Sequence, residues 1–130
     1  MVPLFKDTTL RLGGQNYLGT IWLGAYAANR LCALSFRAPN GEPIAKLTVN
    51  PFPADSGPFN NPSNLVFVKD YAENEGVLAQ LLEKDLPSGS PLLRPTGKFI
   101  QADFAELAML ELSREAFEIF TTYLKEHHHA

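Results

Sequence analysis

The sequence predicts a single α+β domain over residues 1–130, mainly an antiparallel sheet, with a β-hairpin at about 31–49 and helices at about 74–85 and 114–127. Short runs of alternating apolar and polar residues, separated by Gly, Pro and Asn, are typical of antiparallel strands. Apolar residues recur at helical spacing in two places, each time after a residue that can cap a helix. A length of 130 residues suits one domain with its own hydrophobic core.

The N-terminal segment is predicted to be extended. Residues 4–12 follow a loose period of two, which indicates a first strand. The run Gly13-Gly14-Gln15-Asn16 predicts a turn, because glycine accepts the positive φ angles that tight reversals need. The apolar stretch 17–28 is interrupted by Gly19 and Gly24, so it predicts either a strand with a bulge or an irregular segment.

The hairpin at 31–49, LCALSFRAPNGEPIAKLTV, has the strongest local signal. Alternation puts three residues on one face of its first strand: Cys32, Leu34 and Phe36. Asn40-Gly41 is the favoured pair for a reversal. Prolines on both sides of this pair predict that strand pairing starts beyond them.

The segment 50–64 contains four prolines and is predicted to be a long loop. Two interpretations stay open for a loop of this length. Phe52 and Phe59 fold back onto the core in the first. In the second, the loop is exposed and binds a partner, with Asp55 beside these rings.

A strand at 65–68 runs directly into VKDYAENEG, residues 68–76. We expect Asp70 and Tyr71 to make a turn and Asn74 to cap the helix that follows. Glu73 and Glu75 would then lie near the positive end of that helix. The acids of this stretch are therefore explained by local structure before any chemistry is assigned to them.

The C-terminal part is predicted to contain a turn-rich segment, two strands and a final helix. Turn residues fill 85–97, and strands are expected at 99–104 and 107–112. Ser113 is expected to cap the helix at 114–127, and residues 126–130 to form a frayed tail. The helix carries one apolar stripe: Ala116, Phe117, Phe120, Tyr123 and Leu124.

The composition argues against several classes of function. A formal net charge of −3 lacks the basic excess by which most nucleic-acid binders neutralise phosphates, so direct nucleic-acid binding is not expected. The single cysteine, Cys32, gives no internal disulfide and fits a reducing compartment. No long apolar stretch could span a bilayer, so we expect a cytoplasmic protein with no membrane partner.

The residues that usually carry catalysis are sparse. All three histidines are the consecutive tail 127–129, which indicates a solvated tail or the remnant of a purification tag. Cys32 is expected to be a buried strand residue. Two acidic groups could supply paired carboxylates: Asp70, Glu73 and Glu75, or Asp103 and Glu106. The cluster at 70–75 keeps an alternative open, a small metal-dependent hydrolase or nucleotide-modifying enzyme. We expect no enzyme activity, no cofactor and no metal.

Binding to another protein is the remaining class. Aromatic residues anchor many interfaces, and acidic residues can steer a partner. The predicted partner-binding residues are Phe52, Asp55, Phe59, Tyr71, Glu73 and Glu75. A homo-oligomeric scaffold, assembled through the stripe of the final helix, is the second alternative.

Two segments carry a family resemblance. ANRLCALSFRAPNGEPIAKLTVN, residues 28–50, and VFVKDYAENEGVLAQLLEKDL, residues 66–86, together cover roughly a third of the chain. They resemble a family of small proteins of unknown function from plasmids, integrative elements and phages, with the motif Lys-Asp-Tyr-x-Glu-Asn-Glu-Gly at 69–76. The resemblance implies a mobile-element accessory protein that binds a host protein or nucleoprotein complex, such as an anti-CRISPR inhibitor, and it carries over no catalytic residue.

Overall fold

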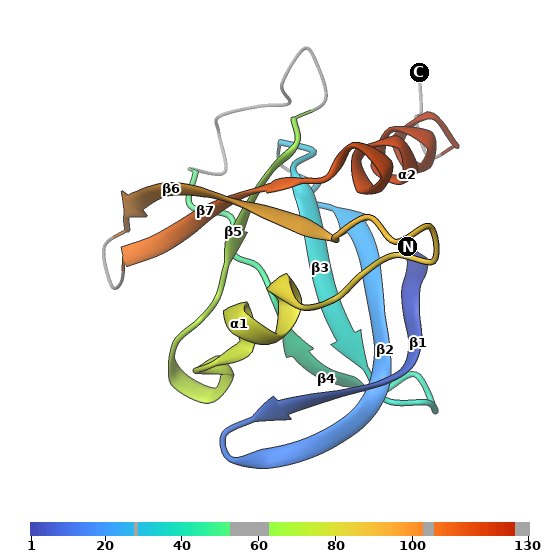
Figure 1. Ribbon diagram of the computed structural model, residues 1–130, viewed down its shortest axis with the longest axis vertical. Coiled ribbons are helices and arrows are strands. Elements are labelled where there is room, and N and C mark those ends of the chain that lie inside the picture. The colour runs from blue at the N-terminus through green and yellow to red at the C-terminus, as the bar shows by residue number, and fades with distance from the viewer. Residues whose placement is uncertain (28, 53–62, 103–105, 127–130) are drawn as a thin grey trace.

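The computed structural model describes residues 1–27, 29–52, 63–102 and 106–126, which form two antiparallel sheets and two α-helices (Figure 1). The four-stranded sheet has the order β1-β2-β3-β4, with the bounds Val2–Leu12, Gln15–Ala25, Cys32–Arg37 and Pro43–Lys46. The three-stranded sheet has the order β5-β7-β6, with the bounds Leu65–Val68, Glu106–Leu112 and Leu93–Gln101. The helices are α1, Val77–Leu82, and α2, Arg114–Glu126. The predicted α+β class is confirmed.

Strands β1 and β2 form a long hairpin around Gly13 and Gly14, whose φ angles are 58° and 82°. For the stretch 17–28 the sequence predicts either a strand with a bulge or an irregular segment. The structure shows a strand as far as Ala25. Gly19 is required there because a Cβ at this position would lie 2.3 Å from the carbonyl oxygen of Arg37. The end of β3 therefore approaches β2 closely only because residue 19 lacks a side chain.

Strands β3 and β4 form the predicted hairpin. Pro43 pairs with Arg37, so the expectation that pairing starts beyond this proline is wrong. Proline is tolerated there because it is the first residue of the strand, where no ladder hydrogen bond is lost. Residues 47–49 then leave this sheet and join β5: the Val49 amide donates to Phe67 O at 2.9 Å, and the Lys69 amide to Leu47 O at 2.9 Å.

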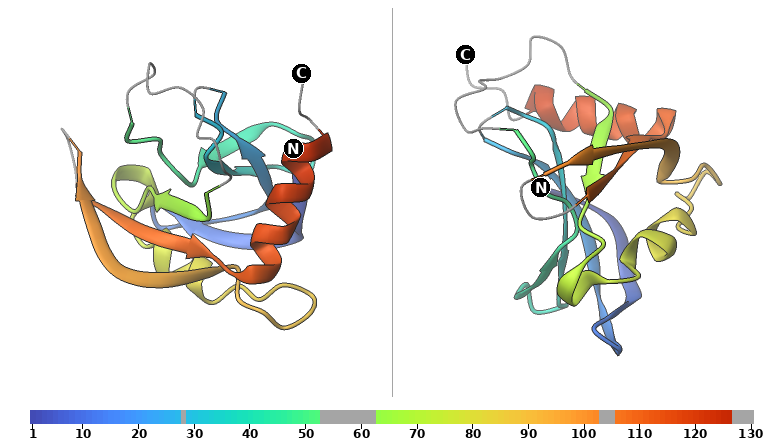
Figure 2. Two further views of the ribbon diagram at one scale, coloured as in Figure 1. Left: turned by 90° about the horizontal axis from the view of Figure 1, so that it is seen from above. Right: turned by 90° about the vertical axis from the view of Figure 1, so that its left-hand side faces the viewer.

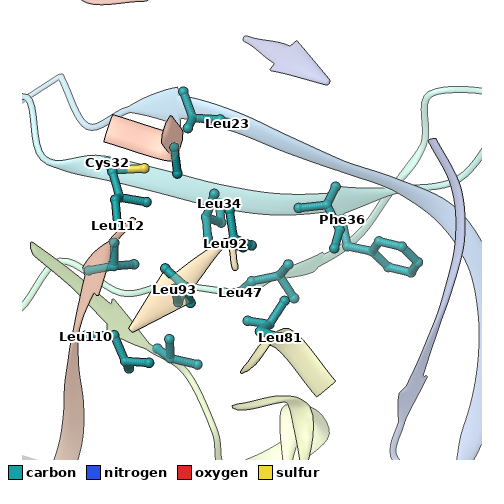
Figure 3. Close-up of a cluster of buried hydrophobic side chains, with 14 of the residues drawn as sticks. Leu23, Cys32, Leu34, Phe36, Leu47, Leu81, Leu92, Leu93, Leu110 and Leu112 are labelled. Atoms are coloured by element: carbon teal, nitrogen blue, oxygen red, sulfur yellow. The ribbon is translucent and has the colours of Figure 1, made fainter. Parts of the chain in front are cut away.

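The main core lies between the two sheets, whose strands run crosswise in Figure 2. Figure 3 shows leucines of the second half of the chain pointing toward β3, where Leu34 and Phe36 are fully enclosed. The buried residues of this main core come from every strand except β4 and from both helices. One cluster therefore joins the N- and C-terminal halves of the chain. Trp22 is half-buried and lies outside the buried clusters.

Strand β6 begins at Leu93, earlier than the predicted position 99, because a register shift between Pro95 and Lys98 accommodates the turn residues. As an edge strand, β6 tolerates a proline. The predicted strand residue Phe104 lies outside the described residues.

Helix α2 begins where the sequence predicts, since the Ala116 amide donates to Ser113 Oγ at 3.2 Å. Its face toward the core carries three buried residues, Ala116, Phe120 and Leu124, as the apolar stripe predicts. The helix is described as far as Glu126, and the tail 127–130 lies outside the described residues.

Candidate partner-binding site

The predicted acidic site at the β5–α1 junction is a structural connection. Asp70 Oδ1 accepts hydrogen bonds from the amides of Gly76, at 2.9 Å, and Leu78, at 3.0 Å. These two amides lie at the N-terminal end of α1, where the helix has no carbonyl groups that could accept their hydrogen bonds. Asp70 therefore caps the helix from outside its first turn.

Asn74 does not cap the helix, and α1 is shorter than the predicted span of about 74–85, since it comprises Val77–Leu82. Residues 72–74 form a short 3₁₀ turn, and the α-helix begins only after Gly76, whose φ is 91°. Asn74 is instead fully buried and donates from Nδ2 to Lys46 O at 2.6 Å. It fastens the junction to the end of β4.

The two glutamates of the junction do not converge with Asp70. Glu73 pairs with Lys69, Oε1 to Nζ at 2.5 Å, and this hydrogen bond lowers the pKa of the Glu73 carboxyl. Glu75 is exposed. Within the described ranges, no group of three His, Cys, Asp or Glu side chains is placed to hold a metal ion.

Two of the predicted aromatic residues, Phe52 and Tyr71, contribute to a second apolar cluster, built on the buried residues Leu31, Phe67 and Leu107. The rings of Phe52 and Phe67 meet edge to face, with centroids 5.7 Å apart. Tyr71 is half-buried against the same cluster, and Lys69 Nζ lies 5.6 Å from its ring. The structure thus gathers Phe52 and Tyr71 in one place, whereas Asp55 and Phe59 lie outside the described residues.

Cys32 is buried in the main core, as expected. Burial raises the pKa of its thiol far above the ordinary value, because the core does not solvate a thiolate. The side chain is therefore a protonated packing residue at neutral pH.

A groove lies between the start of β1 and α2. It has a volume of 560 Å³ and is lined by Val2, Pro3, Leu4, Leu86, Pro87, Glu115, Glu118, Ile119, Thr122, Tyr123 and Glu126. In Figure 1 the N-terminal end of β1 lies near α2, and the loop between α1 and β6 passes beside it. Most of the described lining side chains are apolar, and the charged ones among them are glutamates.

The helix sets the order of these side chains across the groove. At about 100° per residue, Glu115, Thr122 and Glu126 fall within about 40° of one another and form one line along α2. Ile119 and Tyr123 lie between this line and the buried stripe, so they provide the apolar wall. The Ser88 hydroxyl donates to Glu115 Oε2, which fixes one carboxylate at the loop end of the groove.

A second hollow, of 450 Å³, lies between the turns of the two hairpins. Glu73 is its only charged lining residue among those described, and Glu73 is paired with Lys69. Its lining therefore presents no set of unpaired charges to a partner.

Sequence reasoning missed the groove. It assigned Tyr123 to the core stripe and gave no role to Ile119, although both residues lie on the side of that stripe that faces the glutamates. A wide apolar arc bordered by Glu115, Glu118 and Glu126 was the available signal. The other wall comes from β1, more than a hundred residues away in the chain, which no local pattern indicates.

No family model, curated protein or solved structure matches this chain. In the part of the chain that the structure describes, neither helix has the length and apolar character needed to cross a membrane.

Proposed function

We propose that this chain is a non-catalytic protein-binding protein that receives a partner in the groove between β1 and α2. The observation that carries the proposal is the groove itself, an apolar hollow edged by carboxylates. The groove has a volume of 560 Å³, and seven of its described lining residues are apolar. Apolar side chains supply the burial that drives association, and the charged edge adds orientation and speed of encounter.

The resemblance at 28–50 and 66–86 supports a narrower proposal: an accessory protein of a plasmid, integrative element or phage. Small proteins of such elements often act by blocking host machinery. The partner proposed here is a host protein or nucleoprotein complex, as for an anti-CRISPR inhibitor of a defence system. The net charge of −3 adds modest support, because it favours encounter with a basic partner surface.

Affinity capture with a blocked groove tests the proposal. Thr122→Arg places a long side chain in the groove from an exposed helical position, whereas Thr9→Arg makes the same change at an exposed position of β1 outside the groove. Wild type and both variants are used as baits in nuclease-treated bacterial lysate, and captured proteins are identified by mass spectrometry. We expect one stoichiometric protein with wild type and Thr9→Arg that is lost with Thr122→Arg.

Two results would count against this function. Capture that survives Thr122→Arg would remove the groove from the interface, and no capture by any bait would contradict protein binding in this host. Light scattering of the purified protein at two concentrations separates a third outcome. A mass that rises with concentration and falls back in Thr122→Arg would identify a second copy of the chain as the occupant.

A further inference from the structure

We infer that the occupant of this groove is a basic peptide segment of a partner protein that inserts an apolar side chain between its cationic residues. The inference rests on the proposed function and specifies the chemistry of the partner. Three features carry it: the charge of the lining, the position of that charge along α2, and the nature of the opposite wall.

The charged residues described in the lining are all acidic. Glu115, Glu118 and Glu126 line the groove, and none of its described lining residues is lysine or arginine. Arg114 Nε lies 3.6 Å from Glu118 Oε1, but its side chain is 89% exposed, and such surface pairs are weak. Arg114 and Lys125 do not line the groove, so the edge that a ligand meets remains acidic.

The carboxylates lie at both ends of the groove. Glu126 follows Glu115 by eleven positions of the helix, which corresponds to about 16 Å along the axis. An extended segment of about five residues covers that distance. A peptide with Lys or Arg near each end therefore reaches both carboxylates while its middle residue lies against Ile119 and Tyr123.

The wall formed by β1 favours side-chain recognition over strand addition. Val2, Pro3 and Leu4 line the groove, and β1 is an edge strand. Pro3 lacks an amide hydrogen, and the pairing of β1 with β2 is interrupted between Pro3 and Phe5 and again between Phe5 and Thr8. An added strand would find an incomplete ladder here, whereas an apolar side chain finds a continuous wall.

The same charges disfavour the other classes of ligand. Phosphates of nucleic acid or of an anionic membrane would meet three carboxylates and no lining cation among the described residues. An acidic peptide would be repelled in the same way. Basic peptide character is the chemistry that this lining complements.

Fluorescence anisotropy with three labelled peptides of about ten residues tests the inference. The first alternates lysine with leucine, the second alternates lysine with serine, and the third alternates glutamate with leucine. We expect the Lys/Leu peptide to bind most tightly, the Lys/Ser peptide to bind at least tenfold more weakly, and the Glu/Leu peptide not to bind. Binding of the Lys/Leu peptide should weaken as NaCl rises from about 0.05 to 0.5 M, because salt screens the carboxylates.

A charge-matched pair of variants locates the site. The groove variant combines Glu115→Gln, Glu118→Gln and Glu126→Gln, and the control combines Glu42→Gln, Glu83→Gln and Glu106→Gln, three exposed positions outside the groove. We expect about tenfold weaker binding for the groove variant and less than a twofold change for the control. Ile119→Ala should weaken the Lys/Leu peptide and leave the Lys/Ser peptide unchanged.

Two outcomes overturn the inference. Equal effects of the groove and control variants would show that net charge attracts the peptide without a site. Failure of the Lys/Leu peptide, together with a captured protein partner that is lost in Thr122→Arg, would leave the groove as a docking site for different chemistry. In that case the proposed function stands and the basic segment is wrong.

Discussion

Two acidic stretches of the chain look alike in sequence and differ in structure. At 70–75, Asp70 accepts two backbone hydrogen bonds and Glu73 is paired with Lys69. Along α2, Glu115, Glu118 and Glu126 edge a groove, and only Glu115 and Glu118 have a described contact, with the exposed residues Ser88 and Arg114. Asp70 and Glu73 bond to neighbouring groups of the fold, whereas the glutamates of α2 line a groove that a partner can enter.

The comparison shows that the number of carboxylates in a stretch does not indicate a site. What separates the two regions is the supply of local donors. A chain that turns from strand to helix leaves amide groups without partners, and a nearby carboxylate satisfies them. Glu118 and Glu126 lie beyond the first turn of α2, where the amides are already bonded within the helix, so these two carboxylates have no backbone donors to satisfy.

The largest expected effect is the loss of Asn74 at the junction. Asn74→Ala removes the hydrogen bond to Lys46 O and empties a fully buried position. We expect the free energy of unfolding, measured with urea, to fall by about 1–3 kcal/mol, because Lys46 O would lose its buried donor. The neighbouring exposed substitution Glu75→Ala is the control and should change it by less than about 0.5 kcal/mol. Equal stability of the two variants would show that the junction is not fastened through Asn74.

Asp70 comes next. Asp70→Ala removes the acceptor of two amides at the start of α1 and should lower the free energy of unfolding by about 0.5–2 kcal/mol. Asp70→Asn retains an oxygen at the same position and should recover most of this loss. If Asn were as damaging as Ala, charge rather than hydrogen bonding would explain the role of the residue.

A smaller, pH-dependent effect is expected from Glu73. Its folded-state pKa is lowered by the hydrogen bond with Lys69, so its contribution to stability is present above the unfolded pKa of about 4.3 and is lost as pH falls through the lower folded value. NMR titration of the Glu73 carboxyl should show the lowered pKa in wild type and a return toward the ordinary value in Lys69→Met. Lys98→Met, at an exposed position of β6, is the control and should leave the titration unchanged.

The smallest expected effect belongs to the groove. The triple glutamine variant of Glu115, Glu118 and Glu126 should change the free energy of unfolding by less than about 0.5 kcal/mol, since Glu118 and Glu126 are exposed and glutamine at 115 keeps an oxygen that accepts from the Ser88 hydroxyl. Thermal and urea unfolding measure this directly. If the free energy of unfolding fell as much as in Asp70→Ala, the glutamates of α2 would contribute to stability as the junction does, and the two acidic stretches would not differ.

Much of the fold could be predicted from local patterns. The hairpin around Asn40-Gly41, the strand at 65–68 and the cap at Ser113 depend on residues close in sequence, and the structure confirms all three. The start of α1 could not be predicted in the same way. Both Asp70 and Asn74 are suitable caps, and only the tertiary contact of Asn74 with Lys46 O decides between them.

The predicted site residues illustrate the same limit. Phe52 and Tyr71 were chosen as aromatic anchors, but their rings pack on the second apolar cluster. The groove joins α2 to the opposite end of the chain, at Val2, Pro3 and Leu4. A surface assembled from the two ends of a chain leaves no local signal in either of them.

Residues 47–49 take part in both sheets, with amides that bond to Leu34 O on one side and to Phe67 O on the other. Neither sheet can therefore open fully without breaking hydrogen bonds to the other through this short link. Backbone amide hydrogens at Leu47 and Val49 should exchange with solvent deuterium only when the whole domain unfolds, and so report its global stability. The link makes two sheets into one cooperative unit.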